Sequence, residues 1–263
     1  MARKIIGFVA FIYVIREKME ILKYSDDIKK TSKEVIKSFK DDCDKGFALL
    51  EDIGATVTIF GSARFTKENA YYEKAVQMAQ MLSDVGFHIT SGGSYGIMEA
   101  ANKGAFQGKN GESLGFNLVL PFEQDTNSFT TRAATLENFA IRKNMLIRNA
   151  VACVAFPGGF GTMDELFDTT TLILTRKILP LKIYLYGSEF WTPLVDFIKT
   201  VLVNYETIKP QEADIWQISD DMEWIRNDIK KYTKTYLELM RELGLQDNPR
   251  YKLIEKQIEN FTN

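Results

Sequence analysis

The stretch VACVAFPGGFGT, residues 151–162, decides the fold that the sequence predicts. Its first half, Val151 to Phe156, is wholly apolar, which is typical of a strand buried on both faces of a parallel sheet. The glycine-rich turn Pro157 to Thr162 follows, and residues 162–176 carry a helical pattern. A buried strand that passes through a tight turn into a helix is half of a β-α-β unit.

The same alternation of strand and helix continues on both sides of this stretch. Predicted strands cover Thr56–Phe60, Phe87–Thr90, Leu114–Leu120 and Leu181–Tyr186. One predicted helix carries an apolar stripe and stops at Gly86, a second begins near Tyr95, and a third covers Glu137–Asn149 after a polar loop. Strands that recur about every 30 residues with helices between them predict an α/β fold, a Rossmann-like doubly wound parallel sheet with helices on both faces.

The length of the chain favours one domain with appendages. We assign residues 53–205 to the Rossmann-like domain and residues 206–263 to a charged, helical C-terminal extension of it. Residues 19–52 form a helical N-terminal segment in which apolar residues recur at helical spacing, so we expect this segment to lie on a core built elsewhere. The spaced apolar residues are Ile28, Val35, Ile36, Phe39, Phe47 and Leu50.

Residues 1–18 are an apolar extension of uncertain status. The run from Ile5 to Ile15 is shorter than the roughly 20 residues that span a bilayer. A signal peptide has a similar charged start and apolar run, but no small-residue cleavage site follows here. Two interpretations stay open: either Met19 is the native start, or Met1 is and the run is a packed helix or a weak anchor. We expect no stable membrane span and a cytoplasmic location.

Composition narrows the classes of function. A net charge of −2 gives no basic field for a nucleic-acid backbone, so we expect no nucleic-acid partner. Cys43 and Cys153 are far apart and form no C-x-x-C pair, which suits a reducing compartment. His88 is the only histidine, so a multi-histidine metal site is impossible. We predict neither a metal nor a cofactor.

Three turns rich in small residues follow predicted strands: Gly61-Ser62, Ser91 to Gly96, and Pro157 to Thr162. The carboxyl ends of parallel strands meet at one edge of a sheet, where ligands of such folds bind. Glycine lets the backbone turn sharply or approach a ligand, and the helix that follows presents free N–H groups to an anion. Each turn alone could be a plain connection, but three at one edge predict an anion site.

Two charged residues near this edge have competing interpretations. Thr162-x-x-Glu165 is the pattern of a capping box, which would make Glu165 a helix cap instead of a functional carboxylate. Arg142 could lie on a solvated helix face together with Lys143 and Arg148. We expect Cys153 to lie in the core and His88 to be a structural histidine.

The nine residues P-G-G-F-G-T-M-D-E, 157–165, resemble the P-G-G-x-G-T-x-x-E signature of the LOG ("Lonely guy") family, long mislabelled as lysine decarboxylases. The resemblance covers roughly residues 55–205. It includes Gly61-Ser62, the Ser91-Gly92-Gly93 turn, and Arg142-Lys143 on the helix before the signature strand.

The resemblance implies a phosphoribohydrolase that cleaves a nucleoside 5′-monophosphate into free base and ribose 5-phosphate. It also implies that Glu165 and Arg142 are the essential catalytic residues and that the protein is a homodimer or larger. In related proteins the substrate is a cytokinin nucleotide or an ordinary purine or pyrimidine nucleotide. The residues expected around phosphate and ribose are Gly158, Gly159, Gly161, Thr162, Gly61, Ser62, Gly92 and Gly93, with Lys143 and Met98 on the base side.

The sequence also departs from the family pattern. Short plant-type members carry a glutamate before the Arg-Lys pair, whereas Ala140-Ile141 stand here, which weakens the case for a cytokinin substrate. We expect the loop of residues 122–131 to frame the base or sugar, through Gln124, Asn127 and Phe129, and Arg64 to add a positive charge near the phosphate. A pyridoxal-dependent decarboxylase is disfavoured because Ile89, not lysine, follows His88. A non-catalytic nucleotide-binding sensor or carrier stays as the alternative.

Overall fold

The computed structural model of the chain describes residues 26–120 and 125–261. The predictions for residues 1–18, for Met19 and for Phe122 and Gln124 lie outside these ranges. Within the described residues, no helix is both long enough and apolar enough to cross a membrane.

Seven parallel strands form one sheet in the order β4-β3-β2-β1-β5-β6-β7. The order reverses direction between β1 and β5, so the sheet is doubly wound as the sequence predicts. The strands are β1 Thr56–Phe60, β2 His88–Ser91, β3 Ser113–Leu118, β4 Arg132–Leu136, β5 Ala150–Ala155, β6 Lys182–Leu185 and β7 Trp216–Ile218.

Helices connect the strands and flank the sheet. The α-helices are α2 Ser32–Leu50, α3 Ala70–Val85, α4 Ile97–Gln107, α5 Phe139–Ile147, α6 Phe160–Leu174, α7 Ser188–Phe197, α8 Met222–Glu242 and α9 Pro249–Glu259. Shorter turns are the 3-10 helices η1 Asp26–Lys29 and η3 Pro210–Asp214 and the π-helical turn η2 Ile198–Leu202. The helix that the sequence ends at Gly86 does end there, because Gly86 adopts a positive φ of 120°.

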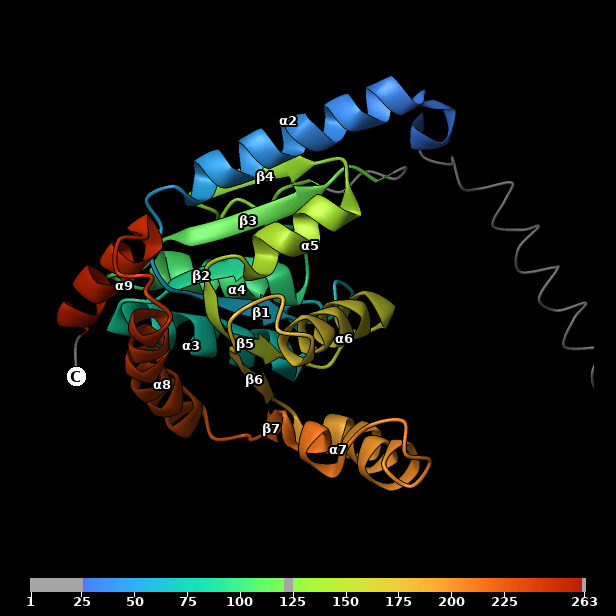
Figure 1. Cartoon of the computed structure of the whole chain (residues 1–263), viewed down its shortest axis with the longest axis vertical. Coiled ribbons are helices and arrows are strands. Elements are labelled where there is room, and N and C mark those ends of the chain that lie inside the picture. The colour runs from blue at the N-terminus through green and yellow to red at the C-terminus, as the bar shows by residue number, and fades with distance from the viewer. Residues whose placement is uncertain (1–25, 121–124, 262–263) are drawn as a thin grey trace, which may run out of the picture.

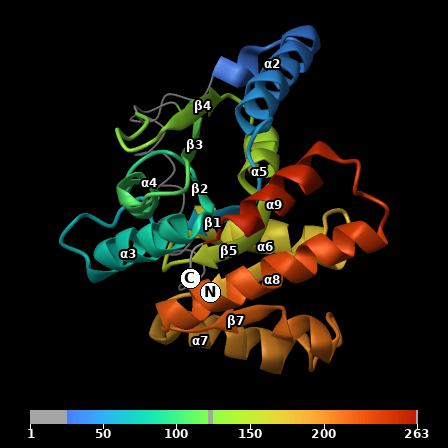
Figure 2. The same cartoon turned by 90° about the vertical axis from the view of Figure 1, so that its left-hand side faces the viewer.

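The helices bury the sheet from both sides and create two hydrophobic cores. One core joins α3, α4, α8 and α9 to one face of the sheet. The other joins α2, α5, α6 and α7 to the opposite face. Figure 2 shows α3 and α4 on one side of the sheet and α2, α5 and α6 on the other. This arrangement confirms the prediction of a sheet with helices on both faces.

Strand β4 corrects the prediction of a polar loop before the third helix. The strand pairs along its whole length with β3, from Leu114 opposite Arg132 to Leu118 opposite Leu136. Every residue of the strand except Leu136 is partly or fully exposed, and as the edge strand β4 pairs with only one neighbouring strand. A short, mostly exposed edge strand without a long apolar run resembles a loop in sequence.

Helix α2 corrects the expected contact surface of the N-terminal segment. It crosses over β4 and α5 at one end of the sheet (Figure 1). Most of the predicted apolar stripe faces away from the core, and Ile36 is 69% exposed. The helix packs through Asp42, Gly46 and Leu50, which follow one another at intervals of four residues and are buried.

The C-terminal residues complete the sheet and one of its cores. Strand β7 pairs with β6, and α8 places Ile225 and Ile229 in the core that α3 and α4 share. The Asp228 carboxylate of α8 accepts a hydrogen bond from the Tyr184 hydroxyl of β6 at 2.6 Å. Strand β7 and helix α7 were not predicted from the sequence.

Candidate functional site

A cleft of about 820 Å³ opens at the carboxyl ends of the strands, at the point where the strand order reverses. These strand ends lie on the right in Figure 1. The turn after β1 and the turn after β5 are joined directly, since the Ser62 N–H donates to the Pro157 carbonyl at 3.1 Å. The Ser62 carbonyl in turn accepts from the Ile97 N–H at the start of α4, at 3.0 Å. Two of the three predicted turns are therefore one continuous structure, and the cleft lies at the site that doubly wound folds use for ligands.

Most of the residues predicted from the sequence line this cleft. They are Gly61, Ser62, Gly92, Met98, Arg142, Gly158, Gly159, Gly161, Thr162 and Glu165, and Arg64 lines it as well. Gly93 and Lys143 are not among the lining residues. Gly93 has a positive φ of 74°, and a side chain there would press on the backbone of Gly115 in β3. Gly93 therefore belongs to a tight turn beside the site.

The glycine-rich turn delivers the chain into α6 with its first amides uncapped. The N-cap residue is Gly159, and no side chain caps the helix. The capping box that Thr162 and Glu165 could form is therefore absent, because α6 begins at Phe160, three residues earlier than that box requires. The first N–H groups of a helix have no partner inside it, and together with the helix dipole they attract an anion.

The three glycines of this turn differ in what surrounds them. A Cβ atom on Gly158 would overlap the Thr162 Oγ1 atom, so this glycine lets the turn close against the helix. A Cβ atom on Gly159 or Gly161 would meet nothing within 4 Å. Packing inside the chain therefore does not require glycine at these two positions, and both face space that a ligand can enter.

Glu165, which is buried, and Arg142, which is mostly buried, form an ion pair that lines the cleft. The Arg142 Nη1 atom lies 3.7 Å from the Glu165 Oε1 atom, and the Glu165 residue is only 7% exposed. Burial raises the pKa of Glu165 to about 7, and the opposing charge of Arg142 does not cancel that rise. Burial also lowers the pKa of Arg142. The pair combines a carboxyl group that titrates near neutrality with a fixed guanidinium, a combination typical of functional sites.

Backbone carbonyl groups hold the Arg142 side chain in place. Its Nε–H donates to the Phe116 carbonyl of β3 at 2.7 Å, and an Nη2–H donates to the Gly92 carbonyl at 3.5 Å. A Cβ atom on Gly92 would overlap both the guanidinium and the Met98 sulfur. Arg142 is thus a mostly buried group bound to the sheet, and the interpretation of a solvated helix face is wrong for this residue.

Lys143, next along α5, turns toward α6. Its Nζ atom lies 2.8 Å from Asp164 Oδ1 and 3.9 Å from Asp168 Oδ1. Phe139, the first residue of α5, lines the cleft and is 56% exposed, yet the sequence analysis did not select it. The one sequence signal is a large apolar residue at the start of a short helix. This signal is weak, because only tertiary contacts distinguish such a residue from a core residue.

Other chemistry-bearing side chains lie away from the cleft. The His88 Nδ1 atom accepts a hydrogen bond from the Glu112 N–H at 3.0 Å, and Cys153 is buried in the core, in agreement with the predictions for both residues. Among the described residues, no group of three His, Cys, Asp or Glu side chains is arranged to hold a metal ion.

Solved structures and a curated sequence resemble this chain. The protein TM1055, known from an X-ray structure, is 22% identical and has a TM-score of 0.50, with 67% of this chain and 99% of TM1055 covered. The molybdenum cofactor carrier protein of Chlamydomonas reinhardtii is 18% identical with a TM-score of 0.49, covering 68% of this chain and 98% of that one. The likeness to TM1055 concerns the fold alone.

The curated sequence is that of the rice (Oryza sativa subsp. japonica) protein named "Probable cytokinin riboside 5'-monophosphate phosphoribohydrolase LOGL5". It is 32% identical over 118 residues, which are 44% of this chain and 47% of the rice protein. The match therefore spans about half the length of this relative.

A family model described as "Possible lysine decarboxylase" matches residues 98–229, half of the chain. The matched region contains Arg142, the glycine-rich turn and Glu165, and the rice protein carries the LOG name. The chain belongs to this family, the LOG family.

Proposed function

We propose that this protein hydrolyses the N-glycosidic bond of a nucleoside 5′-monophosphate, releasing the free base and ribose 5-phosphate. The observation that carries the proposal is the meeting of three features in one cleft: the uncapped start of α6, the Glu165 carboxyl group and the Arg142 guanidinium. The name of the rice relative supports the same reaction class. We assign Glu165 and Arg142 as the catalytic residues.

The phosphate is proposed to bind at the start of α6. The open space at Gly159 and Gly161 lets an anion approach the amides of the turn. Ser62 and Arg64 line the same cleft and can supply a hydroxyl and a positive charge. A phosphate held there directs the rest of the nucleotide along the cleft toward Glu165, with Met98 and Phe139 as apolar neighbours for the base.

Glu165 is proposed to act on the ribose and Arg142 on the base, the two groups that the breaking bond joins. As the C1′–N bond lengthens, its electron pair leaves with the base, and positive charge develops on the ribose ring. The ionised Glu165 carboxylate stabilises that charge and orients the water whose oxygen bonds to C1′. The water gives up one proton as its oxygen bonds to C1′, and the departing base takes up one proton, so that one water is consumed in total. Arg142 stabilises the negative charge that the base carries before it is protonated.

The test is incubation of the purified chain with a panel of nucleoside 5′-monophosphates, followed by chromatography for free base and ribose 5-phosphate. We expect release from at least one nucleotide, and none from the matching nucleoside, which lacks the phosphate. Glu165→Gln and Arg142→Ala should each abolish most of the activity, whereas Glu223→Gln, at an exposed position on α8 that does not line the cleft, should retain it. Tight binding of a nucleotide without release of base would instead identify a nucleotide-binding sensor or carrier.

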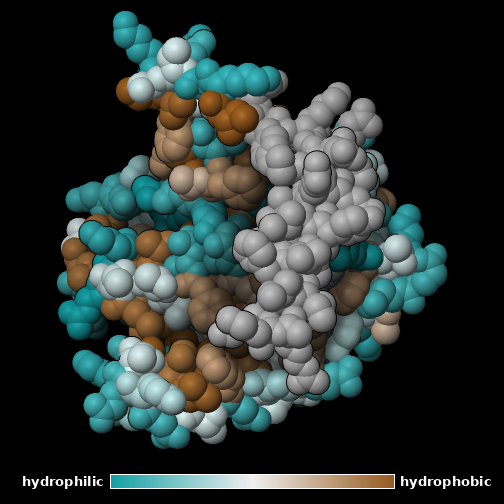
Figure 3. Space-filling view, turned by 90° about the vertical axis from the view of Figure 1, so that its right-hand side faces the viewer, coloured by the Kyte–Doolittle hydropathy of each residue, from teal (hydrophilic) through white to brown (hydrophobic). Residues whose placement is uncertain are grey.

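We further propose that the protein works as a homodimer or larger homo-oligomer. Exposed apolar side chains recur along α6 at Phe160, Phe167 and Leu174, and α7 exposes Phe190 and Phe197. Figure 3 shows apolar surface in the lower half of the face where α6 and α7 lie. A second copy of the chain would cover this surface, and sedimentation at micromolar concentration tests the proposal, since a monomer would contradict it.

A further inference from the structure

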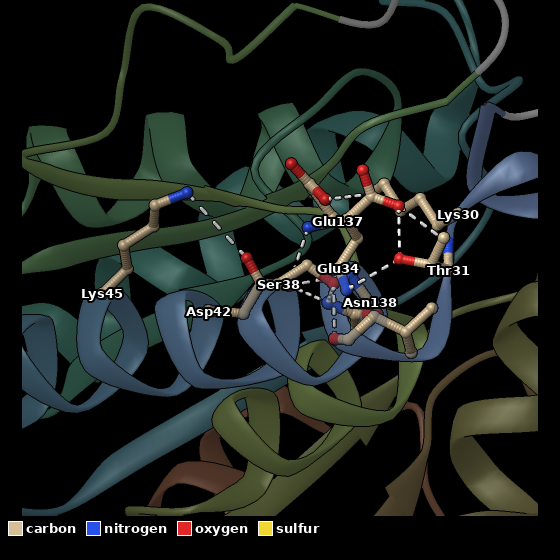
Figure 4. Close-up of polar contacts among 9 residues, drawn as sticks. Lys30, Thr31, Glu34, Ser38, Asp42, Lys45, Glu137 and Asn138 are labelled. Carbon is tan, nitrogen blue, oxygen red and sulfur yellow. Dashed lines mark hydrogen bonds and ion pairs between the residues drawn. The ribbon is translucent and has the colours of Figure 1, made fainter.

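The N-terminal helix α2 places a fully buried carboxylate, Asp42, against the start of α5. One oxygen of this carboxylate, Oδ2, accepts three hydrogen bonds, each 2.8 Å long. The donors are the Glu137 N–H, the Asn138 N–H and the Asn138 side-chain amide. Figure 4 shows Asp42 reaching from α2 to these two residues. The turn between β4 and α5 is thus fixed by a side chain about 95 residues earlier in the chain.

This contact anchors the turn that precedes α5, and the first amides of the helix itself have no side-chain cap. Asn138 is the N-cap residue of α5, and its side chain forms no capping bond within the helix. Its Nδ2–H group donates to Asp42 at 2.8 Å and to the Ser38 hydroxyl of α2 at 3.3 Å. A negative charge at a helix N-terminus also interacts favourably with the helix dipole. The other oxygen, Oδ1, accepts no hydrogen bond from the described residues, and its nearest cation is Lys45 Nζ at 3.9 Å. The hydrogen bonds of this buried carboxylate therefore all go to the turn at the start of α5, and they fix its position.

Arg142 lies one helical turn beyond this anchor. Its backbone N–H donates to the Asn138 carbonyl at 3.0 Å, which makes it part of the first turn of α5. The anchored turn therefore sets the position of the Arg142 backbone, while the Phe116 and Gly92 carbonyl groups fix the position of its guanidinium. One turn after Asp42, Gly46 brings α2 close to α5, since a Cβ atom there would overlap Met145. Both contacts hold α5 at a fixed height above the sheet.

We propose that Asp42 is a positioning residue for Arg142: it holds the start of α5 so that the guanidinium stays beside Glu165. Helix α2 lies outside the residues 98–229 that match the family model, so this contribution comes from a part of the chain that the family match does not cover. The proposal deepens the proposed function and rests on it for its kinetic test.

The kinetic test compares Asp42→Ala with Asp44→Asn on the same helix. Asp44 is exposed and pairs only with Lys40 among the described residues, so it is the matched control. We expect Asp42→Ala to lower kcat roughly 10- to 100-fold with a smaller change in KM, because a displaced catalytic group costs rate. Asp42→Asn keeps an acceptor oxygen and should recover part of kcat. Asp44→Asn should match the wild type within about twofold.

A double-mutant cycle separates positioning from loss of stability. In an Arg142→Lys background, Asp42→Ala should lower kcat much less than it does in the wild type, because the group it positions is already changed. A merely structural role would give the same factor in both backgrounds at a temperature where every variant is folded. Equal factors, or an unchanged kcat in Asp42→Ala, would overturn the proposal.

A spectroscopic test keeps the positioning proposal independent of the reaction. The Arg142 Nε–H group donates to Phe116, so it should give a resolved ¹H–¹⁵N signal that Arg142→Lys removes. Asp42→Ala should shift or broaden this signal, and Asp44→Asn should leave it in place. If no nucleotide is hydrolysed, the proposed function fails while this signal still tests Asp42. A signal that is identical in wild type and Asp42→Ala would refute the positioning role.

Discussion

At the scale of single residues, Glu165 is the group whose environment matters most. Burial raises its pKa to about 7, so its ionised fraction grows between about pH 6 and pH 8. If the carboxylate is the active form, kcat/KM should increase with pH through this window and then level off. The substrate phosphate also titrates, near pH 6, so two ionisations shape the rising limb.

Substitution of Lys143 tests whether Glu165 causes the rise of kcat/KM with pH. The positive charge of Lys143 lowers the pKa of Glu165. Lys143→Gln should therefore move the part of the kcat/KM rise that Glu165 causes to higher pH. The phosphate of the free substrate does not change between the two proteins. The measurement is kcat/KM from pH 5 to pH 9 for both, and coincident profiles would contradict the assignment.

The same raised pKa has a consequence for stability. The folded state holds the Glu165 proton more tightly than the unfolded state, so ionisation of Glu165 opposes folding once the pH exceeds its unfolded value of 4.5. The penalty grows up to about pH 7 and amounts to about 3 kcal/mol above that. Glu165→Gln should therefore stabilise the protein at pH 8 and have much less effect at pH 4.5. Urea unfolding at the two pH values measures this, and a uniform effect would contradict it.

The sequence was informative about which residues gather in the cleft and uninformative about how they are held there. Spacing after predicted strands was sufficient to bring Gly61, Gly158 and Glu165 to one edge. The burial of Arg142 was not predictable from its neighbours on α5, because Phe116 and Gly92, which hold it, come from other elements. Asp42 was missed for the same reason, since its partners are about 95 residues away.

At the scale of elements, prediction succeeded where one local pattern decided the structure. Strand β5 is apolar throughout and lies inside the sheet between β1 and β6, and its predicted place was correct within one residue at each end. The prediction missed strand β4 because this short edge strand buries only Leu136 and its sequence contains no long apolar run. The packing surface of α2 failed because a buried carboxylate and a glycine, Asp42 and Gly46, replaced the usual apolar stripe. Hydrophobic spacing carries no signal for such a contact.

The turn before α6 offers a matched pair of substitutions. Gly158→Ala should destabilise the fold by about 1–3 kcal/mol, because its methyl group would overlap Thr162. Gly159→Ala should leave the stability within about 0.5 kcal/mol, because the methyl group would enter open space. It should nevertheless raise KM for the nucleotide if phosphate occupies that space. Denaturation and steady-state kinetics measure both effects, and an unchanged KM in Gly159→Ala would argue against phosphate at this turn.

At the scale of the whole molecule, the two proposed catalytic residues belong to helices of one core only. Arg142 and Glu165 belong to helices α5 and α6, which pack on one face of the sheet, whereas α8 closes the opposite face. The Asp228 contact with Tyr184, and an ion pair with Lys182 at 3.3 Å, fix α8 to β6. Stability supplied by α8 should therefore be separable from the chemistry of the cleft.

Ile229 on α8 tests this separation because its side chain is completely buried in the core on that face. Ile229→Ala should lower the free energy of unfolding by about 2–5 kcal/mol, since the truncated side chain leaves a cavity. Leu243→Ala, at an exposed position just beyond the same helix, is the control and should change stability by less than about 0.5 kcal/mol. At a temperature where Ile229→Ala remains folded, its kcat should equal that of the wild type. A kcat that falls together with stability would mean that the face closed by α8 also shapes the cleft, and the two cores would then be coupled through the sheet.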